Sequence, residues 1–293
     1  MTQVGVGNSR TARAMTVSAS DVAALRAQFP DAFGNVRQQW TTGLLWGAAI
    51  AYLLWSLWYF EFWKLFFFNE RASRMFTEFF LWEDIAGWDY QGIYTGLAET
   101  IAMAFLGTLL GSVAALVIAF AAARNTMPQT LIRHIVRRFL DLLRGIDSLI
   151  WALVFVRAVG LGPLAGVLSI FVSDAGTLSK LYSEAIENVD RKQVEGVRAT
   201  GADPVKIIRF GYLPQIAPVF ISLSLYSFES SVRSATILGI VGAGGIGKVL
   251  VDRFRAGFFD QVAFVVINIL ICVFVIDWLS GKVRAHFIGA RPH

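Results

Sequence analysis

A stripe of polar side chains runs along the fifth apolar segment of the chain, residues 214–241. Its members recur at steps of three and four residues, which places them on one side of a helix. They are Ser222, Tyr226, Glu229, Arg233 and Thr236. The Arg233 guanidinium is a forked hydrogen-bond donor that suits the oxygens of an oxyanion. Because charged groups inside apolar spans usually mark a pathway or a partner, the stripe predicts a path for an anion.

Two interpretations of the charged pair stay open. Glu229 and Arg233 are four residues apart and could neutralise each other, in which case they would only hold helices together. Alternatively Arg233 binds the anion, and Glu229 keeps the affinity of the resting site for the anion low. Asp174, in the fourth apolar segment, could face the same path or bond to a neighbouring helix. The predicted pathway residues are Asp174, Tyr226, Glu229, Ser230, Arg233 and Ser234.

A polar segment, residues 183–213, lies between the fourth and fifth apolar segments. The glycine at position 201 and the pair Asp203-Pro204 predict a helix, a left-handed break and a second helix start. Leu213-Pro214 then begins the next span. An ordered polar element in such a loop indicates a surface on which a partner docks, although a solvated helical hairpin without a partner has the same periodicity. The predicted docking residues are Glu195, Gly196, Ala199, Thr200, Gly201, Ala202 and Asp203.

A glycine-rich run, residues 242–247, matches the pattern G-x-G-x-x-G. No strand precedes it and no βαβ unit surrounds it, so a dinucleotide site is not indicated. The run follows an apolar span, and we expect a flexible outer loop that gates a cavity or contacts another protein. The residues concerned are Gly242, Gly244, Gly245 and Gly247.

The elements that position these groups are predicted to be membrane helices. The chain has 293 residues, of which 56% are hydrophobic and 16% charged, against about 25% charged in soluble domains. Six segments approach the ~20 apolar residues that a spanning helix needs. They are 40–60, 93–123, 143–159, 161–179, 214–241 and 258–279. The fold class is therefore an all-α integral membrane protein with six transmembrane helices.

Loop charges predict the orientation. Basic residues gather in the N-terminal tail, in the loop 124–144 and after position 279, whereas residues 61–91 carry six acids and three bases. The positive-inside rule then puts both termini and the 183–213 loop in the cytoplasm. The expected parts are a cytoplasmic tail (1–39), a first span with an outer interfacial segment (40–92), a five-helix core (93–285) and a short C-terminal tail (286–293). We expect no metal site, since the single cysteine, Cys272, and three scattered histidines show no ligand spacing.

Five runs of sequence resemble the permeases of phosphonate importers, which belong to the binding-protein-dependent ABC importer superfamily. They are residues 137–146, 162–168, 179–187, 194–202 and 233–247. The 194–202 run resembles the ATPase-docking signature of that superfamily, in which Glu195 is followed six residues later by Gly201 and then by Leu213-Pro214. The chain departs from the usual signature at Gly196-Val197 and at Gly211. The resemblance covers approximately residues 90–285.

The resemblance implies a type I ABC importer permease in a bacterial inner membrane. It also implies a homodimer, two separate ATPase subunits that hold ATP and Mg²⁺, and an extracytoplasmic substrate-binding protein. The chain would bind no cofactor itself and would not be an enzyme. Its cargo would be phosphonate or a related phosphorus oxyanion; a permease of the same fold for phosphate, phosphite or an amino acid is the alternative. A self-sufficient secondary transporter predicts internal repeats, and none is evident.

Overall fold

The computed structural model describes residues 23–24, 27–28, 36–62, 70–82 and 85–288. The chain divides into two compact units, residues 1–72 and 73–293, here called the N-terminal unit and the core unit. The N-terminal unit contains α2 (Val36–Tyr59), a helix whose large apolar side chains are exposed from Trp40 to Tyr59. Its apolar surface suits hydrocarbon, which agrees with the first predicted span.

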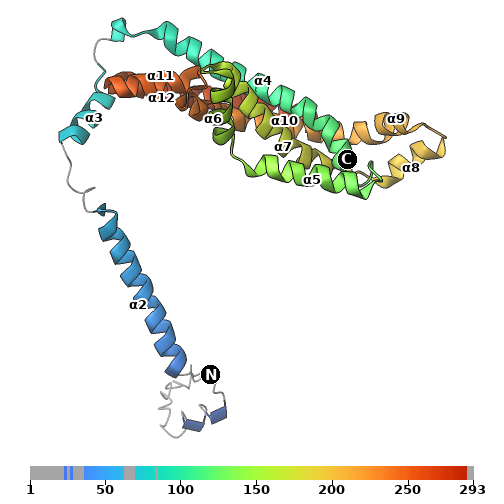
Figure 1. Ribbon diagram of the computed structural model, residues 1–293, viewed down its shortest axis with the longest axis horizontal. Helices are drawn as coiled ribbons and strands as arrows, with labels where there is room; N and C mark the ends of the chain where they lie inside the picture. The colour runs from blue at the N-terminus through green and yellow to red at the C-terminus, as the bar shows by residue number, and fades with distance from the viewer. Residues whose placement is uncertain (1–22, 25–26, 29–35, 63–69, 83–84, 289–293) are drawn as a thin grey trace, which may run out of the picture. The chain divides into compact units, whose positions relative to one another are not determined.

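The core unit is entirely helical in its described residues, as predicted (Figure 1). A short amphipathic helix, α3 (Glu70–Phe80), crosses the boundary between the units. The following elements are η3 (Ile85–Gly87), α4 (Tyr90–Ala122), α5 (Thr130–Gly145), α6 (Ser148–Val159), α7 (Pro163–Glu187), α8 (Arg191–Ala199), α9 (Pro204–Ile207), the π-helical turn η4 (Ile208–Tyr212), α10 (Leu213–Ile240), α11 (Gly245–Ala256) and α12 (Phe259–Ile288).

Small residues allow α4 and α7 to pack closely. A Cβ atom at Gly107 would collide with the Ile170 side chain, and one at Gly111 would approach the Cβ of Asp174 at 2.9 Å. The sequence places these glycines four residues apart, a spacing typical of close helix contacts in membranes. The contact between α4 and α7 is the most extensive one between helices of the core unit, and it fixes the position of Asp174.

Five of the six predicted spans correspond to helices that, among the described residues, are long and apolar enough to cross a membrane; the third predicted span does not. The third predicted span, 143–159, is broken. α5 ends at Gly145, and the Asp147 carboxylate then caps α6 by accepting a hydrogen bond from the Leu149 amide. α6 has 12 residues, about 18 Å of helix, which is shorter than the ~30 Å of hydrocarbon.

Both α5 and α6 pack against α7. α7 continues past the apolar segment to Glu187, as its charged C-terminal turns indicate. Two ion pairs join the C-terminal half of α7 to α5: Arg137 pairs with Glu187, and Lys180 donates to Asp141 at 2.6 Å. The hydrogen bond from Lys180 lowers the pKa of Asp141 below its usual value. α5 and α6 together therefore follow α7 in the opposite direction.

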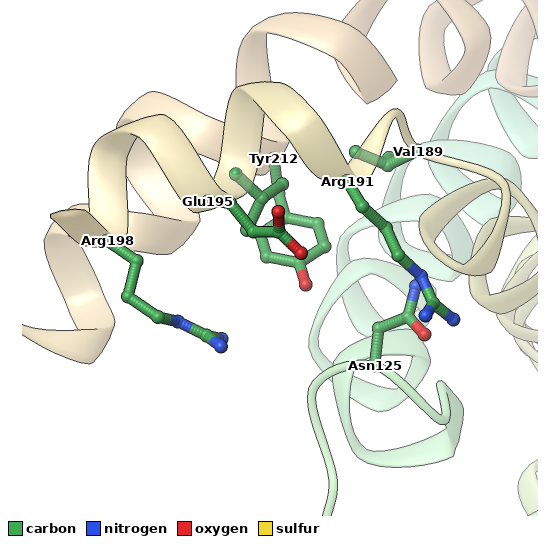
Figure 2. A pocket seen from close by; sticks show the side chains of 7 residues that line it. Asn125, Val189, Arg191, Glu195, Arg198 and Tyr212 are labelled. Carbon is green, nitrogen blue, oxygen red and sulfur yellow. The ribbon is translucent and has the colours of Figure 1, made fainter.

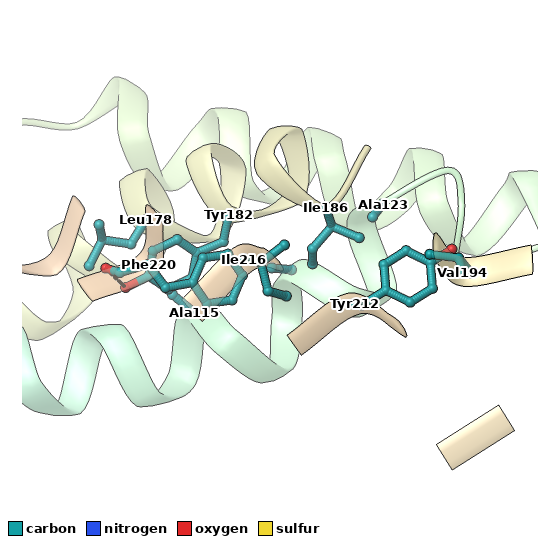
Figure 3. Packing of buried hydrophobic residues seen from close by; sticks show 10 residues of the cluster. Ala115, Ala123, Leu178, Tyr182, Ile186, Val194, Tyr212, Ile216 and Phe220 are labelled. Atoms are coloured by element: carbon teal, nitrogen blue, oxygen red, sulfur yellow. Dashed lines mark hydrogen bonds between the residues drawn. The ribbon is translucent and has the colours of Figure 1, made fainter. Parts of the chain in front are cut away.

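One hydrophobic cluster joins α4, α7 and α10 to the polar segment that follows α7. Figure 3 shows Leu178 and Phe220 at one side of this cluster and Val194 with Tyr212 at the other. Tyr182 stacks on Phe220, with ring centroids 4.0 Å apart. α8 is thus attached to the long helices through apolar packing.

Candidate functional site

The polar segment 183–213 folds as its sequence predicts. The Asp190 carboxylate caps α8 by accepting from the Lys192 amide at 3.0 Å. Gly201 takes a left-handed φ of 74° and separates α8 from α9. Asp203 is at the N-cap of α9 and Pro204 begins it, although the Asp203 carboxylate pairs with Lys206 and caps no amide. Helix, glycine break and second helix are confirmed.

One side chain anchors α8. Val194 is buried, and it packs with Tyr212 and Ile216 in the cluster of Figure 3. Gly211 permits the approach, since a Cβ there would lie 3.3 Å from the Val194 Cα. Residues 205, 208 and 212 recur at helical spacing, but they form no continuous buried side, because Val205 is 75% exposed. α9 contacts the cluster through Ile207, and η4 adds Tyr212.

The opposite side of α8 is bare. Gly196 and Gly201 have no atom within 4 Å of where a Cβ would lie. The predicted docking residues 195, 196, 199–201 and 203 are exposed, and Ala202 is half-buried. Figure 2 shows Arg191, Glu195 and Arg198 extending from α8 beside a hollow of about 240 Å³ that Asn125 and Tyr212 also line. α8 and α9 lie together at one end of the core unit (Figure 1).

A polar cavity of about 180 Å³ lies between α7 and α10. It brings together four of the predicted pathway residues: Asp174, Tyr226, Ser230 and Ser234. Further hydroxyl groups line it, namely Ser148, Ser173, Thr177, Ser227 and Ser231. Ser148, Thr177 and Ser227 were not predicted. Their signal is the same helical spacing, since Thr177 follows Asp174 by three residues and Ser227 precedes Ser231 by four.

Asp174 joins three helices at the wall of this cavity. It is 8% exposed. Its Oδ2 accepts hydrogen bonds from Thr108 of α4 at 2.7 Å and from Ser231 of α10 at 3.0 Å. The carboxylate bonds to neighbouring helices, which is one of the two predicted roles for Asp174, and it also lines the cavity.

Glu229 and Arg233 do not pair with each other, as one interpretation expected, but both pair with residues of α12, which agrees with a role in holding helices together. Glu229 is buried and pairs with Arg284 of α12, while Arg233 pairs with Asp277 of α12 at 3.4 Å. Both side chains point toward α12, because this neighbouring helix carries a residue of opposite charge within reach of each. Asp277 is an acid inside an apolar segment, a signal present in the sequence but not used. Neither Glu229 nor Arg233 lines the cavity.

The glycine run forms a tight turn and a helix start in place of the expected flexible loop. Gly242 and Gly244 have left-handed φ values of 98° and 82°. Gly245 and Gly247 are buried at the start of α11. The Gly245 amide donates to Glu99 at 3.1 Å, and the next amide donates to Thr100 Oγ1 at 2.8 Å. α11 lies at the end of the core unit away from α8 (Figure 1).

These features define a class of membrane protein: a bundle of long apolar helices with a polar cavity and an anchored helix projecting beyond the bundle. Residues 107–286 match the family described as binding-protein-dependent transport system inner membrane component. The chain belongs to this family, which confirms the resemblance seen in the sequence. It is therefore the membrane permease component of a transport system and not its catalytic subunit.

Several relatives carry names of transporters for phosphorus compounds. The chain is 40% identical over 198 residues, 68% of its length, to 72% of a phosphite transport system permease protein from Stutzerimonas stutzeri. It is 37% identical over 196 residues, 67% of its length, to 37% of a phosphate-import permease from Mycolicibacterium smegmatis. It is 48% identical over 122 residues, 42% of its length, to the whole of a putative cryptic phosphonate transport permease from Escherichia coli.

A solved structure has the same fold. The inward-facing methionine ABC transporter MetNI contains a chain that superposes with a TM-score of 0.58, covering 67% of this chain and 94% of its own length, at 23% identity. At that identity the similarity concerns the fold alone, which is that of an ABC importer permease.

Proposed function

We propose that this chain is the permease of an ATP-driven importer for phosphorus oxyanions, with phosphite, phosphate and phosphonate as the candidate cargoes. The observation that carries the proposal is the 40% identity, over most of the permease core, to a phosphite transport permease. The cavity between α7 and α10 agrees with it, since eight residues with hydroxyl groups that can bond to oxyanion oxygens line it beside apolar side chains.

The proposed assembly contains two copies of the chain, two ATPase subunits and an external binding protein. The chain has no phosphate loop of the form G-x-x-x-x-G-K-[ST], so ATP and Mg²⁺ would be held by the ATPases. The exposed residues of α8 and of the turn after it, among them Glu195, Gly196 and Gly201, would enter a cleft on each ATPase. Closure of the ATPases would then move α8, and Val194 would transmit the motion to α4, α7 and α10.

The proposed orientation puts α8 and both termini in the cytoplasm. The basic residues of α5 support it, because such residues mark the cytoplasmic side of a membrane protein and Arg137 among them pairs with Glu187, shortly before α8. α5 and α6 would together make the third crossing, in which α6 carries the apolar part. The glycine turn at 242–247 would face the outside, where it would meet the binding protein or gate the cavity.

The test is uptake into proteoliposomes that contain the permease, its ATPase and its binding protein. Radiolabelled phosphite, phosphate, an alkylphosphonate and methionine are supplied in parallel, with and without ATP. We expect at least one phosphorus oxyanion to accumulate only when both ATP and the binding protein are present. Accumulation of methionine alone, or equal accumulation without ATP, would contradict the proposal.

A further inference from the structure

Hydroxyl groups in the long helices fall into two groups according to their hydrogen bonds. Most donate back to a carbonyl of their own helix, the usual way to satisfy a hydroxyl inside a membrane span. They include Ser112, Ser169, Ser179, Ser183 and Ser224. In the described part of the chain, none of the eight hydroxyls that line the cavity between α7 and α10 makes such a bond. Ser227 and Ser231 bond to Asp174 instead. Five others on α7 and α10 do not bond to Asp174: Ser173, Thr177, Tyr226, Ser230 and Ser234.

The five hydroxyls come from two helices and meet at one cavity. Ser230 and Ser234 are one turn apart on α10, and Ser173 and Thr177 are one turn apart on α7. Tyr226 and Ser230 are exposed and mark the open side of the cavity, whereas Asp174 forms its buried wall. These hydroxyls are half-buried or exposed, so their donors stay available on the side of the cavity. A polar ligand that enters the cavity could accept hydrogen bonds from several of them at once.

We propose that these hydroxyls form a binding site for a tetrahedral oxyanion on its way through the permease, an inference that rests on the proposed function. Hydroxyl groups donate to the anionic oxygens. Among the described residues, no lysine or arginine lines the cavity, and the nearby Arg233 is paired with Asp277. A site made of neutral donors binds an anion more weakly than an arginine would, which suits a site that must release its ligand in each cycle.

Asp174 restricts which oxyanion the site accepts. Its carboxylate repels an oxyanion that is fully ionised, but it can accept a hydrogen bond from one that keeps a proton as a P–OH group. Thr108 and Ser231 hold the carboxylate in place through Oδ2. The site therefore favours protonated phosphorus oxyanions and disfavours sulfate, which carries no proton at neutral pH.

The first test compares two triple variants in the proteoliposome assay. One, Thr177→Val with Ser230→Ala and Ser234→Ala, removes cavity hydroxyls. The control, Ser112→Ala with Ser169→Ala and Ser183→Ala, removes hydroxyls that bond to their own helix. The cavity variant should lose at least about tenfold in uptake rate, since each lost bond to a charged ligand is worth about that factor. ATP hydrolysis stimulated by the binding protein should remain.

The outcomes separate this inference from the proposed function. Absence of phosphorus oxyanion uptake by the wild type overturns the proposed function and this inference with it. Wild-type uptake together with equal rates for the two triple variants overturns the oxyanion site and leaves the proposed function intact. Loss of uptake in the cavity variant, with normal uptake in the control variant, supports the oxyanion site.

A second test measures protection of the site directly and does not require transport. The chain has one cysteine, so Ser230→Cys in a Cys272→Ala background places a single thiol at the open side of the cavity. Phosphite and phosphate should slow its alkylation severalfold, and sulfate should not. A Thr95→Cys control, on the exposed N-terminal part of α4, should react equally with and without phosphite. Unprotected Ser230→Cys, or equal protection by sulfate, would overturn the assignment.

Discussion

Glycine serves opposite purposes at the two ends of the core unit. At the α11 end, the glycines are required by the fold: a Cβ at Gly239 would lie 2.6 Å from the Gly244 carbonyl oxygen, and one at Gly247 would overlap the Thr236 carbonyl. At the α8 end, Gly196 and Gly201 have open space around them. At the α11 end, glycine lets α10 and the start of α11 pack closely against each other. The α8 end keeps a surface free, which is what a docking partner requires.

The two ends also differ in how their backbone is held. Glu99 and Thr100 of α4 accept the first amides of α11, so that end is bonded directly to a long helix. α8 is held mainly by the burial of Val194. α8 is thus held to the long helices by apolar packing while its other residues are exposed. A force applied to α8 by a docked partner could therefore be transmitted to the long helices.

The largest expected effect is that of Gly247→Ala. Its Cβ would meet backbone atoms of α10, which cannot move aside as a side chain can. We expect a loss of about 3 kcal/mol or more, at the upper end of what overpacking costs, and therefore a clearly lower Tm. Gly281→Ala, at a position with open space in α12, is the matched control and should not lower the Tm. Equal Tm values would contradict the packing described for the α11 end.

Glu229→Ala tests an internal charge contact that the sequence assigned wrongly. It leaves the Arg284 guanidinium without its partner next to the core. Breaking a fully buried pair costs about 3–5 kcal/mol; since the Arg284 side chain is 31% exposed, we expect about 2 kcal/mol. Thermal unfolding of the purified permease measures it. Arg233→Ala breaks the more exposed pair with Asp277 and should cost less than about 1 kcal/mol; the reverse order would contradict the pairing.

Val194→Ala weakens the anchor of α8. The buried methyl groups lost are worth about 1–2 kcal/mol, but the loss concerns the attachment of α8 more than the long helices. We expect a small change in Tm and a large drop in uptake per ATP hydrolysed, measured in the same proteoliposomes. Val205→Ala removes the same atoms from an exposed side chain and should not lower the Tm. A fall in Tm without any change in coupling would show that α8 is not the mechanical link.

The smallest change in stability is expected for Gly196→Ala. Alanine favours the helix by about 0.5–1 kcal/mol and meets no atom of this chain. The variant should therefore be slightly more stable and yet transport less, because the added methyl group would meet the ATPase. A rise in Tm with unchanged uptake would show that this side of α8 is not in contact with a partner.

The sequence predicts the polar segment well because its signals are local. Asp190, Gly201 and Pro204 act on their own backbone, so the helix ends could be placed before any packing was known. The third span was predicted as one unbroken helix for a related reason. Its apolar length includes the end of α5, and the break at Asp147 depends on a cap that hydropathy does not register.

The candidate pathway was predicted only in part, since its members depend on which helices are neighbours. Helical spacing placed Tyr226, Ser230 and Ser234 on α10 correctly, and all three line the cavity. Spacing along one helix also suggested that Glu229 pairs with Arg233. It contains no information on α12, where Asp277 and Arg284 supply nearer partners.

The measurement that tests the central claim most directly compares Gly201→Asp with Gly257→Asp. Both glycines are exposed, have left-handed φ values of 74° and 84°, and have open space around them. The same strain is therefore introduced at each end, and only Gly201 belongs to the proposed docking surface. Each variant is inserted in membranes and assayed for ATPase bound to the permease and for ATP-driven uptake. The account predicts that Gly201→Asp loses the ATPase and uptake while Gly257→Asp keeps its ATPase; full ATPase binding and wild-type uptake by Gly201→Asp would contradict it.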